Sequence, residues 1–253
     1  MLRVFTLGSI TFHLYNVMLC LGLVGLVLQM ERTLSKGLFT ERQAMAIRLA
    51  VPLSVLVAPI GACVLYNVLQ VHRFDPKHWD LGFTFYGMWL TVFPLCWLIA
   101  RFGGLRLIEL LNLHAIGLAF AHACGRVGCF LGGCCFGCPV PWGGVRYPLG
   151  SLPDQYFPNT MLCPIQLYEA VFLFALAVVL DRKIALHSRF LVYVASYAIA
   201  RFVLEFFRGD PRGKLLDSIP FSPAQVICIC IVAVYLGWFS KRLLRFKWAK
   251  YDV

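Results

Sequence analysis

The sequence predicts an all-α, polytopic integral membrane protein, and its composition is the first of two observations behind this fold class. Of the 253 residues, 60% are hydrophobic and only 14% are charged, whereas a soluble domain has about 25% charged residues. A core cannot account for this apolar excess, because a globule of this size needs a polar surface. We therefore expect the chain in a membrane.

Seven apolar runs are the second observation. A hydrocarbon core about 30 Å thick takes roughly 20 helical residues to cross. Runs of this length lie near residues 11–30, 46–70, 81–100, 107–124, 162–180, 189–207 and 221–240. The run at 189–207 contains Arg201 and Glu205, but an apolar loop in lipid would leave its backbone groups unpaired, so we expect a helix there too. No cleavage site of small residues precedes the first run, so we expect that run to be retained.

Lysine and arginine in the connections predict the orientation. With the N-terminus outside, fourteen of the 23 basic residues fall in cytoplasmic segments and eight in outer segments, while Arg201 lies within a run. Basic residues accumulate on the cytoplasmic side, which favours an outer N-terminus and a cytoplasmic C-terminus. The same explanation covers the net charge of +11, so nucleic acid is not an expected partner. We expect a single membrane-embedded domain, residues 1–253, with an ordered outer loop at about 138–163.

An arginine lies inside the apolar segment HACGRVGCFLGGCCFGC, residues 122–138. His122, Arg126 and Cys129 are spaced i, i+4 and i+7 and therefore share one helix face. The glycines beside them allow a backbone or a ligand to approach closely. A guanidinium that cannot lose its charge requires an anion in such a place.

A second set of ionisable side chains lies in SYAIARFVLEFFRGDPRG. Intervals of four, four and three put its polar members on one helix face: Tyr197, Arg201, Glu205 and Arg208. The pair of Arg201 and Glu205 either holds helices together or belongs to a functional site, as ionisable residues within membranes often do. Arg126 and Arg201 together suit a phosphate, whose geometry matches arginine forks. A phospholipid headgroup is the nearest abundant phosphate.

The cysteines of this segment allow several explanations. Their spacing is C-x4-C-C-x2-C, which matches no ordinary zinc pattern, so no metal is expected. Buried packing is one explanation, and a disulfide between Cys138 and Cys163 across the outer loop is another. Cys135-Phe-Gly-Cys138 is also formally a C-x-x-C pair, which would suit a thiol oxidoreductase if it stood at a helix start.

Four other polar residues each have a structural interpretation beside a functional one. His122 is either a general base or a packed residue that makes a hydrogen bond. Tyr15 and Tyr86 lie near the outer ends of their runs, where tyrosines commonly form an interfacial belt. Glu169 lies at the start of the 162–180 run, where a carboxylate favours a helix N-terminus.

The motifs GRVGCFLGGCCFG, GFTFYGMWL, PIQLYEA and SYAIARFVLEFFRGD resemble those of the bacterial phosphatidylglycerol–prolipoprotein diacylglyceryl transferases. The resemblance covers most of the chain, from Tyr15 to residue 240. It implies that a diacylglyceryl group moves from phosphatidylglycerol to the thiol of a lipobox cysteine in a preprolipoprotein, and that glycerol phosphate leaves. Fixed cations at the phosphate would stabilise this leaving group in a dry site. It further implies no cofactor, a multi-pass location in the bacterial cytoplasmic membrane, and a monomer.

Carried over by position, the resemblance implies roles for particular residues. Arg126 and Gly137 match the arginine and the closing glycine of the first motif. Arg201 and Glu205 match the late arginine and glutamate, with Tyr197 before them. The catalytic set expected from this comparison is Arg126, Arg201, Glu205, Tyr86, Tyr197 and His122. The phospholipid-binding set is Arg126, Arg201, Tyr15, Cys129, Gly137 and Glu169.

The sequence departs from the family pattern at three positions. Cys129 stands where the family usually has asparagine, and Cys134 stands where an acidic residue is expected. Tyr86 stands where many members have histidine, which removes a proposed general base. A divergent lipid transferase with another acceptor is therefore an alternative function. A membrane thiol oxidoreductase using Cys134, Cys135 and Cys138 is a second alternative. A lipid or anion carrier is a third, and a non-catalytic lipid-binding relative is a fourth.

Overall fold

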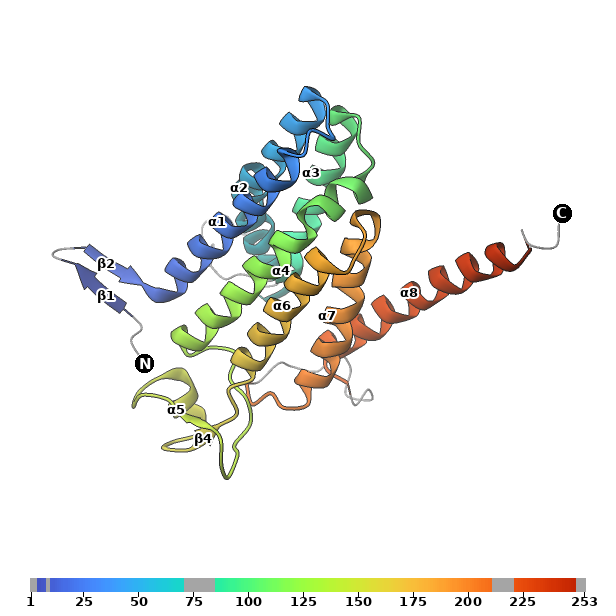
Figure 1. Ribbon diagram of the computed structural model, residues 1–253. Coiled ribbons are helices and arrows are strands. Elements are labelled where there is room, and N and C mark those ends of the chain that lie inside the picture. Colours follow the sequence, from blue (N-terminus) through green and yellow to red (C-terminus); the bar gives the residue numbers. More distant parts are fainter. Residues whose placement is uncertain (1–3, 8–9, 71–84, 211–220, 249–253) are drawn as a thin grey trace. The chain divides into compact units, whose positions relative to one another are not determined.

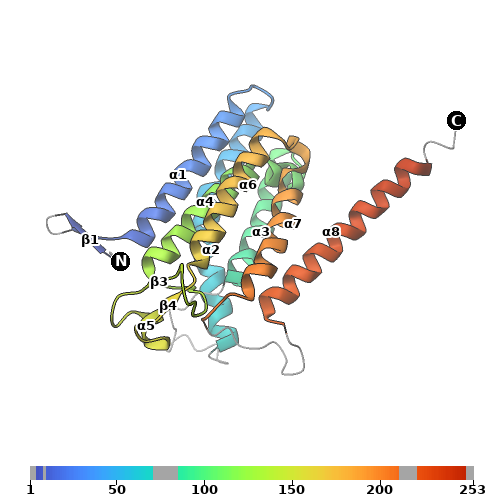
Figure 2. The same cartoon turned by 60° about the horizontal axis from the view of Figure 1, so that its bottom comes forward.

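The computed structural model describes residues 4–7, 10–70, 85–210 and 221–248, with side chains for 12–67, 87–210 and 221–237. The described chain is mostly helical (Figures 1 and 2). It divides into two compact units. Unit 1 comprises Met1–Leu26 and Ala115–Val253, and unit 2 comprises Val27–His114.

Each predicted apolar run coincides with one long helix. These helices are α1 (Leu14–Leu34), α2 (Glu41–Gln70), α3 (Phe85–Gly103), α4 (Leu107–Gly132), α6 (Ile165–Arg182), α7 (Arg189–Glu205) and α8 (Pro223–Trp248). Among the described residues, three helices are long and apolar enough to cross a membrane: Leu14–Leu34, Glu41–Asn67 and Leu107–Gly132. Two more apolar helices are shorter, Gly87–Gly103 and Pro223–Gly237. The helical fold is as predicted, whereas seven membrane crossings and their orientation stay predictions.

Four short strands depart from the all-α prediction. β1 (Val4–Leu7) pairs antiparallel with β2 (Ile10–His13), and β3 (Val145–Arg146) pairs with β4 (Met161–Leu162). The first run was expected to begin at residue 11, but helix α1 begins only at residue 14. The segment ITFH is rich in β-branched and aromatic side chains, which fit a strand better than a helix.

Unit 1 holds α6, α7, α8, most of α4 and the first part of α1. Helix α6 packs against α7, and α7 packs against α8. Gly22 of α1 approaches α4 so closely that a Cβ atom there would lie 2.9 Å from the Cα of Ala121. Small residues at such contacts let two helix backbones come together in a membrane. This unit contains every polar side chain of the two sequence motifs that carry the predicted site.

The segment 138–163, predicted to be an outer loop, folds around β3, β4 and the short helix α5 (Leu152–Tyr156). Its core consists of the buried side chains Phe136, Tyr147 and Leu162. The Asp154 carboxylate accepts hydrogen bonds from the backbone N–H groups of Asn159 at 3.1 Å and Gly150 at 2.9 Å. These hydrogen bonds favour the charged form and lower the pKa of Asp154. The loop therefore has its own internal contacts.

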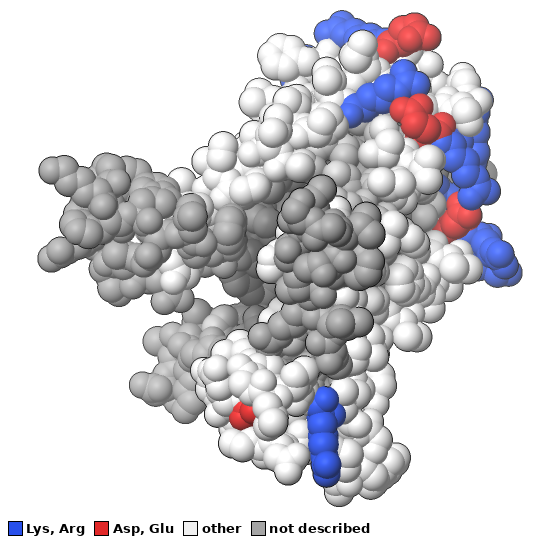
Figure 3. Space-filling model, turned by 90° about the vertical axis from the view of Figure 1, so that its left-hand side faces the viewer, with Lys and Arg blue, Asp and Glu red and all other residues white. Residues whose placement is uncertain are grey.

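Unit 2 holds α2, α3 and the adjoining parts of α1 and α4. Helices α2 and α3 meet at two glycines, and a Cβ atom on Gly61 would clash with the carbonyl oxygen of Gly87. Charged side chains lie at the helix ends, as in the ion pair of Arg48 Nε with Glu31 Oε1 at 2.8 Å. In Figure 3 most of the Lys, Arg, Asp and Glu side chains in view lie together, with uncharged residues next to them. This distribution is typical of helices whose sides contact lipid.

Candidate functional site

Arg126, on α4, is held by residues of two other helices. Its Nε lies 3.0 Å from Oε1 of Glu169 on α6, and its Nη2 donates to the hydroxyl of Tyr197 on α7 at 3.2 Å. The Tyr197 hydroxyl in turn donates to Glu169 Oε1 at 2.7 Å. The side chain of Arg126 is 16% exposed and that of Glu169 is 1% exposed. A cation and its anion are thus held together almost out of reach of water, and we call these three residues the Arg126 cluster.

The first turns of α6 explain how PIQLYEA supports this cluster. Gln166 and Glu169 are three residues apart and so share one face of α6. The Nε2 of Gln166 donates to the backbone carbonyl of Cys134 at 2.8 Å. One helix face therefore fixes the cysteine segment through Gln166 and the Arg126 guanidinium through Glu169. The sequence analysis placed Glu169 at a helix N-terminus and in the phospholipid-binding set, but it did not identify Arg126 as its partner.

His122 lies one turn before Arg126 on α4 and contacts two tyrosines of α7. Its Nδ1 is 3.0 Å from the hydroxyl of Tyr193. Its ring meets the ring of Tyr197 edge-on, with 4.6 Å between the centroids. The hydrogen bond fits the interpretation as a packed residue, and the position beside the Arg126 cluster fits a general base. The structure is consistent with both.

Arg201 and Glu205 form a buried ion pair along α7, as their spacing of four residues predicted. The Nη2 of Arg201 contacts Glu205 Oε2, and the two side chains are 8% and 4% exposed. Ser222, just before α8, donates to Glu205 Oε1 at 2.9 Å. The Nη1 of Arg201 is buried and has no hydrogen-bond partner among the described residues. Buried donors are almost always paired, so this nitrogen is suited to an anion that enters the site.

Arg208, in the segment after α7, is paired with another carboxylate, that of Asp210. Its Nε and Nη2 donate to Oδ1 and Oδ2 of Asp210, both at 2.8 Å. Burial opposes the charge of Arg208, but the hydrogen bonds and the charge of Asp210 outweigh burial and raise its pKa. The sequence placed Arg208 on the face of Arg201 and gave it no partner. The sequence feature that indicates this pair is the aspartate two residues after Arg208, in the segment RGD.

The backbone after α7 crosses the end of the first motif. The N–H of Cys138 donates to the carbonyl of Phe207 at 2.8 Å. On the other side, a Cβ atom on Gly137 would clash with the carbonyl oxygen of Cys163. Only glycine allows the backbones to approach this closely. Packing thus accounts for Gly137, which the sequence analysis had placed in the phospholipid-binding set.

The two tyrosines near the predicted outer ends lie in different units. Tyr15 lies in the first turn of α1 and is 38% exposed. Its Cδ2 lies 3.1 Å from where a Cβ atom of Gly128 would be, so its ring covers α4 between Arg126 and Cys129. Tyr86 lies in the first turn of α3 in unit 2, and its side chain lies outside the described residues.

The cysteines of the first motif converge in a way their spacing did not indicate. The Sγ atoms of Cys129, Cys134 and Cys135 all lie within 4.8 Å of one another, and we call them the thiol cluster. Cys138 and Cys163 are both free thiols, so the disulfide considered for them is not formed in this structure. The C-x-x-C pair of Cys135 and Cys138 follows the end of α4 and begins no helix. The helix start that would favour a redox pair is thus absent from this described stretch.

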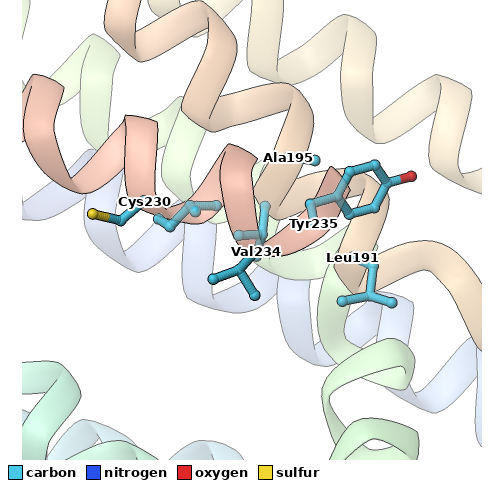
Figure 4. Close-up of a pocket in the computed structure, with 7 residues that line it drawn as sticks. Leu191, Ala195, Cys230, Val234 and Tyr235 are labelled. Carbon is cyan, nitrogen blue, oxygen red and sulfur yellow. The ribbon is translucent and has the colours of Figure 1, made fainter. Parts of the chain in front are cut away.

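An apolar groove of about 410 Å³ runs between α7 and α8. Figure 4 shows side chains of both helices lining it, among them Leu191 and Ala195 from α7 and Cys230, Val234 and Tyr235 from α8. All of the lining is in unit 1. A groove with an apolar lining along two helices suits a hydrocarbon chain.

The predicted site residues of unit 1 are thus largely brought together. Arg126 meets Tyr197 directly, and Arg201 follows Tyr197 by one turn of α7. Sequence reasoning missed the supporting residues Gln166, Tyr193, Asp210 and Ser222. Two of them had a readable signal: Gln166 is spaced three residues from Glu169 on an expected helix, and Asp210 follows Arg208 by two residues.

Fold and site together define an integral membrane protein with a buried cationic site. The model of a family described as prolipoprotein diacylglyceryl transferase matches residues 3–240. The chain belongs to this family, and the resemblance drawn from its motifs is confirmed.

Individual relatives with low sequence identity to this chain agree with the family match. A phosphatidylglycerol–prolipoprotein diacylglyceryl transferase of Clostridium tetani is 28% identical over 252 residues, covering 94% of this chain and 98% of the relative. The protein of the same name from Cutibacterium acnes is 31% identical over 260 residues, covering 92% and 86%. One from Dehalococcoides mccartyi strain BAV1 is 27% identical, covering 96% and 94%. The similarity extends over nearly the whole of each chain.

Proposed function

We propose that this protein transfers a diacylglyceryl group from phosphatidylglycerol to the thiol of a lipobox cysteine in a preprolipoprotein. The observation that carries the proposal is the buried Arg126 cluster, one helical turn from a second buried arginine. Family membership supports the reaction type, and the names of the relatives supply the donor and the acceptor class. The bond that forms is sulfur to glyceryl carbon, and the bond that breaks joins that carbon to a phosphate oxygen.

The two arginines would act on the leaving group. Tyr197 holds Arg126, and Arg201 lies four residues further along α7, a rise of about 6 Å. We infer that both guanidiniums reach the same phosphate, because Tyr197 contacts one of them and lies one helical turn from the other. The Nη1 of Arg201, which has no hydrogen-bond partner within the described part of the chain, is a donor for the negative charge that grows on the glycerol phosphate oxygen. In a site with little water, such fixed donors stabilise the transition state strongly.

Before lipid binds, the carboxylates lower the free-energy cost of burying these two cations. Glu169 and Glu205 are 1% and 4% exposed in their side chains, and each neutralises one arginine. An unpaired buried guanidinium would be costly in an apolar surrounding. They would also hold each guanidinium in one orientation, so that little reorganisation is needed when phosphate arrives.

The apolar groove would receive an acyl chain of the donor. Val194, one of its lining residues, lies seven residues before Arg201, so the groove and the cation share a face of α7. A headgroup at Arg201 would therefore leave its chains running along α7 and α8. This arrangement supports a phospholipid over a small soluble phosphate as the ligand.

The acceptor thiol must lose a proton to attack. His122 is our candidate for a side-chain base in unit 1, because it lies one turn from Arg126 and hydrogen bonds with Tyr193. Tyr86 is the candidate that stands where many family members have histidine. The positive field of the arginines would favour the thiolate in either case.

The placement in the cell follows from the same reasoning. We propose a multi-pass protein of the bacterial cytoplasmic membrane with seven spans, an outer N-terminus and a cytoplasmic C-terminus, acting as a monomeric single domain. Phosphatidylglycerol, the lipobox segment and the bilayer are its partners. The site would then face the outer leaflet, where a preprolipoprotein emerges.

Complementation tests the proposed function. The gene is expressed in a bacterium depleted of its own diacylglyceryl transferase, and lipoproteins are analysed by mass. We expect growth and lipoproteins heavier by one diacylglyceryl group. Arg126→Ala should abolish both while the protein still inserts, and the matched control Arg146→Ala, an exposed arginine of β3, should not. Unmodified lipoproteins with well-expressed wild-type protein would leave the divergent transferase with another acceptor as the better account.

A further inference from the structure

The three sulfur atoms of the thiol cluster are arranged like three of the four ligands of a tetrahedral metal site. Cys129 lies in the last turn of α4, and Cys134 and Cys135 lie just beyond its end. Their Sγ atoms are all within 4.8 Å of one another. Zinc–sulfur bonds of about 2.3 Å in a tetrahedral site place sulfurs roughly 3.8 Å apart. Each sulfur is therefore within about an ångström of a ligand position.

The backbone at Cys135 is a second, independent observation. Its φ of +57° lies in the left-handed region. Residues other than glycine, asparagine and aspartate rarely adopt this backbone conformation. Only one other non-glycine residue of the described chain has a positive φ, and that residue is Asn159. If packing alone determined position 135, glycine would fit this conformation better. The unusual backbone brings the Cys135 sulfur toward its two neighbours.

Residues around the thiol cluster provide positive charge and a hydrogen bond that would stabilise three thiolates. Arg208 hydrogen bonds with the Cys135 side chain, and Arg126 lies one turn before Cys129 on α4. Both guanidiniums also have carboxylate partners, Glu169 and Asp210, so they offset the negative charge of the sulfurs only in part. The Cys134 carbonyl is fixed by Gln166 at 2.8 Å, which holds the segment in position. Outer contacts of this kind commonly orient metal ligands.

We propose that Cys129, Cys134 and Cys135 bind a zinc ion whose fourth position is open to the acceptor thiol. Among the described residues no histidine or carboxylate completes the group, and three protein ligands with an open position are typical of a catalytic zinc site. Zinc suits a thiolate set and takes no part in electron transfer. The inference rests on the proposed function for the identity of the incoming thiol.

The step balances without any further reactant. Water leaves the fourth position, the acceptor sulfur takes its place, and the thiol proton passes to water, because a coordinating thiol is deprotonated. The bound sulfur then gives an electron pair to the glyceryl carbon. The sulfur–carbon bond forms, the carbon–oxygen bond breaks, and glycerol phosphate leaves with that bond's electron pair. Cysteine at positions 129 and 134 would then have a role in place of the family's asparagine and acidic residue.

Metal content is the first test. Full-length protein, purified in detergent and dialysed against trace zinc chloride, should hold one zinc ion per chain by elemental mass spectrometry. Cys129→Ser, Cys134→Ser and Cys135→Gly should each lower zinc affinity at least about tenfold, while the matched control Cys163→Ser keeps it. Cys135→Gly relieves the backbone, so it should still fold. Zinc absent from wild type, or retained in all three variants, overturns the inference.

Cobalt substitution tests the open position separately from lipid transfer. Protein loaded with cobalt chloride should show a sulfur-to-cobalt band, and that band should grow when a lipobox peptide containing cysteine is added. The same peptide with serine should not change it. No cobalt–thiolate band, or one that the cysteine peptide leaves unchanged, contradicts the inference. Transfer by zinc-free protein would overturn the inference and leave the proposed function standing. Zinc binding without any transfer would retain the metal site and refute the proposed function.

Discussion

Removing Glu169 should destabilise the protein more than removing an exposed carboxylate, and the structure gives the magnitude. The Arg126 Nε and Glu169 Oε1 atoms are 3.0 Å apart, so their attraction is about 5.5 kcal/mol at an effective dielectric constant of about 20. Glu169→Ala deletes this attraction and leaves a buried guanidinium uncompensated. We expect a loss of about 3–5 kcal/mol in the free energy of unfolding.

The double variant Arg126→Met/Glu169→Leu separates stability from activity. It removes both charges and fills a similar volume, so its stability should lie near that of wild type or above it. It should nevertheless transfer no lipid, because the phosphate has lost its cation. Glu109→Ala is the matched control. Its partner Arg106 is 79% exposed, and exposed pairs contribute at most about 1 kcal/mol.

The assay is unfolding in mixed detergent micelles, followed by helical circular dichroism, with diacylglyceryl transfer measured on the same samples. The expected order of stability is double variant near wild type, then Glu109→Ala, then Glu169→Ala. Equal stability of Glu169→Ala and Glu109→Ala would refute the assignment of a buried pair. An active double variant would refute the phosphate-binding role of Arg126.

Four further predictions concern other parts of unit 1. Glu205→Gln, which keeps a hydrogen-bond acceptor for Arg201, should retain more transfer activity than Glu205→Ala and keep the acidic limb of the pH–rate profile; loss of that limb would make Glu205 the base. Arg201→Lys should rescue Arg201→Ala poorly, because lysine lacks the bidentate fork, and equal rates for Lys and Arg would contradict this. Gly137→Ala should lower the yield of folded protein in detergent, because its Cβ clashes with backbone, and unchanged yield and melting temperature would show that the crossing is looser. The lowered pKa of Asp154 means that its contribution is present above the unfolded pKa and lost as pH falls through the folded pKa. The protection of the Gly150 amide from hydrogen exchange, measured relative to the intrinsic rate at each pH, should accordingly fall on acidification in wild type and not in Asp154→Asn.

Sequence patterns predicted the parts of this fold that depend on local periodicity. Seven apolar runs became seven helices, because a long apolar run in lipid has to satisfy its own backbone. The pair of Arg201 and Glu205 was readable for the same reason, since four residues are one helical turn. The strand β2 was missed because the ITFH segment adjoins an apolar run, and hydropathy does not distinguish a strand from the start of a helix.

Contacts between helices were not readable in this way. The partner of Arg126 is Glu169, 43 positions later in the numbering, and only the packing of α4, α6 and α7 brings them together. The thiol cluster was missed for a different reason. Its spacing fits no known ligand pattern, but the chain turns back at Gly133 with φ +69° and Cys135 with φ +57°. Ligand patterns in sequence do not encode such a turn.

Direct measurement of the reaction tests the central claim that two buried arginines stabilise glycerol phosphate as it leaves. Purified protein is incubated with phosphatidylglycerol vesicles and a lipobox peptide, and both products are quantified by mass spectrometry. The account predicts equal amounts of thioether-linked diacylglyceryl peptide and glycerol phosphate for wild type and Arg146→Ala. It predicts neither product for folded Arg126→Ala and Arg201→Ala. Wild-type rates in either folded variant would contradict it.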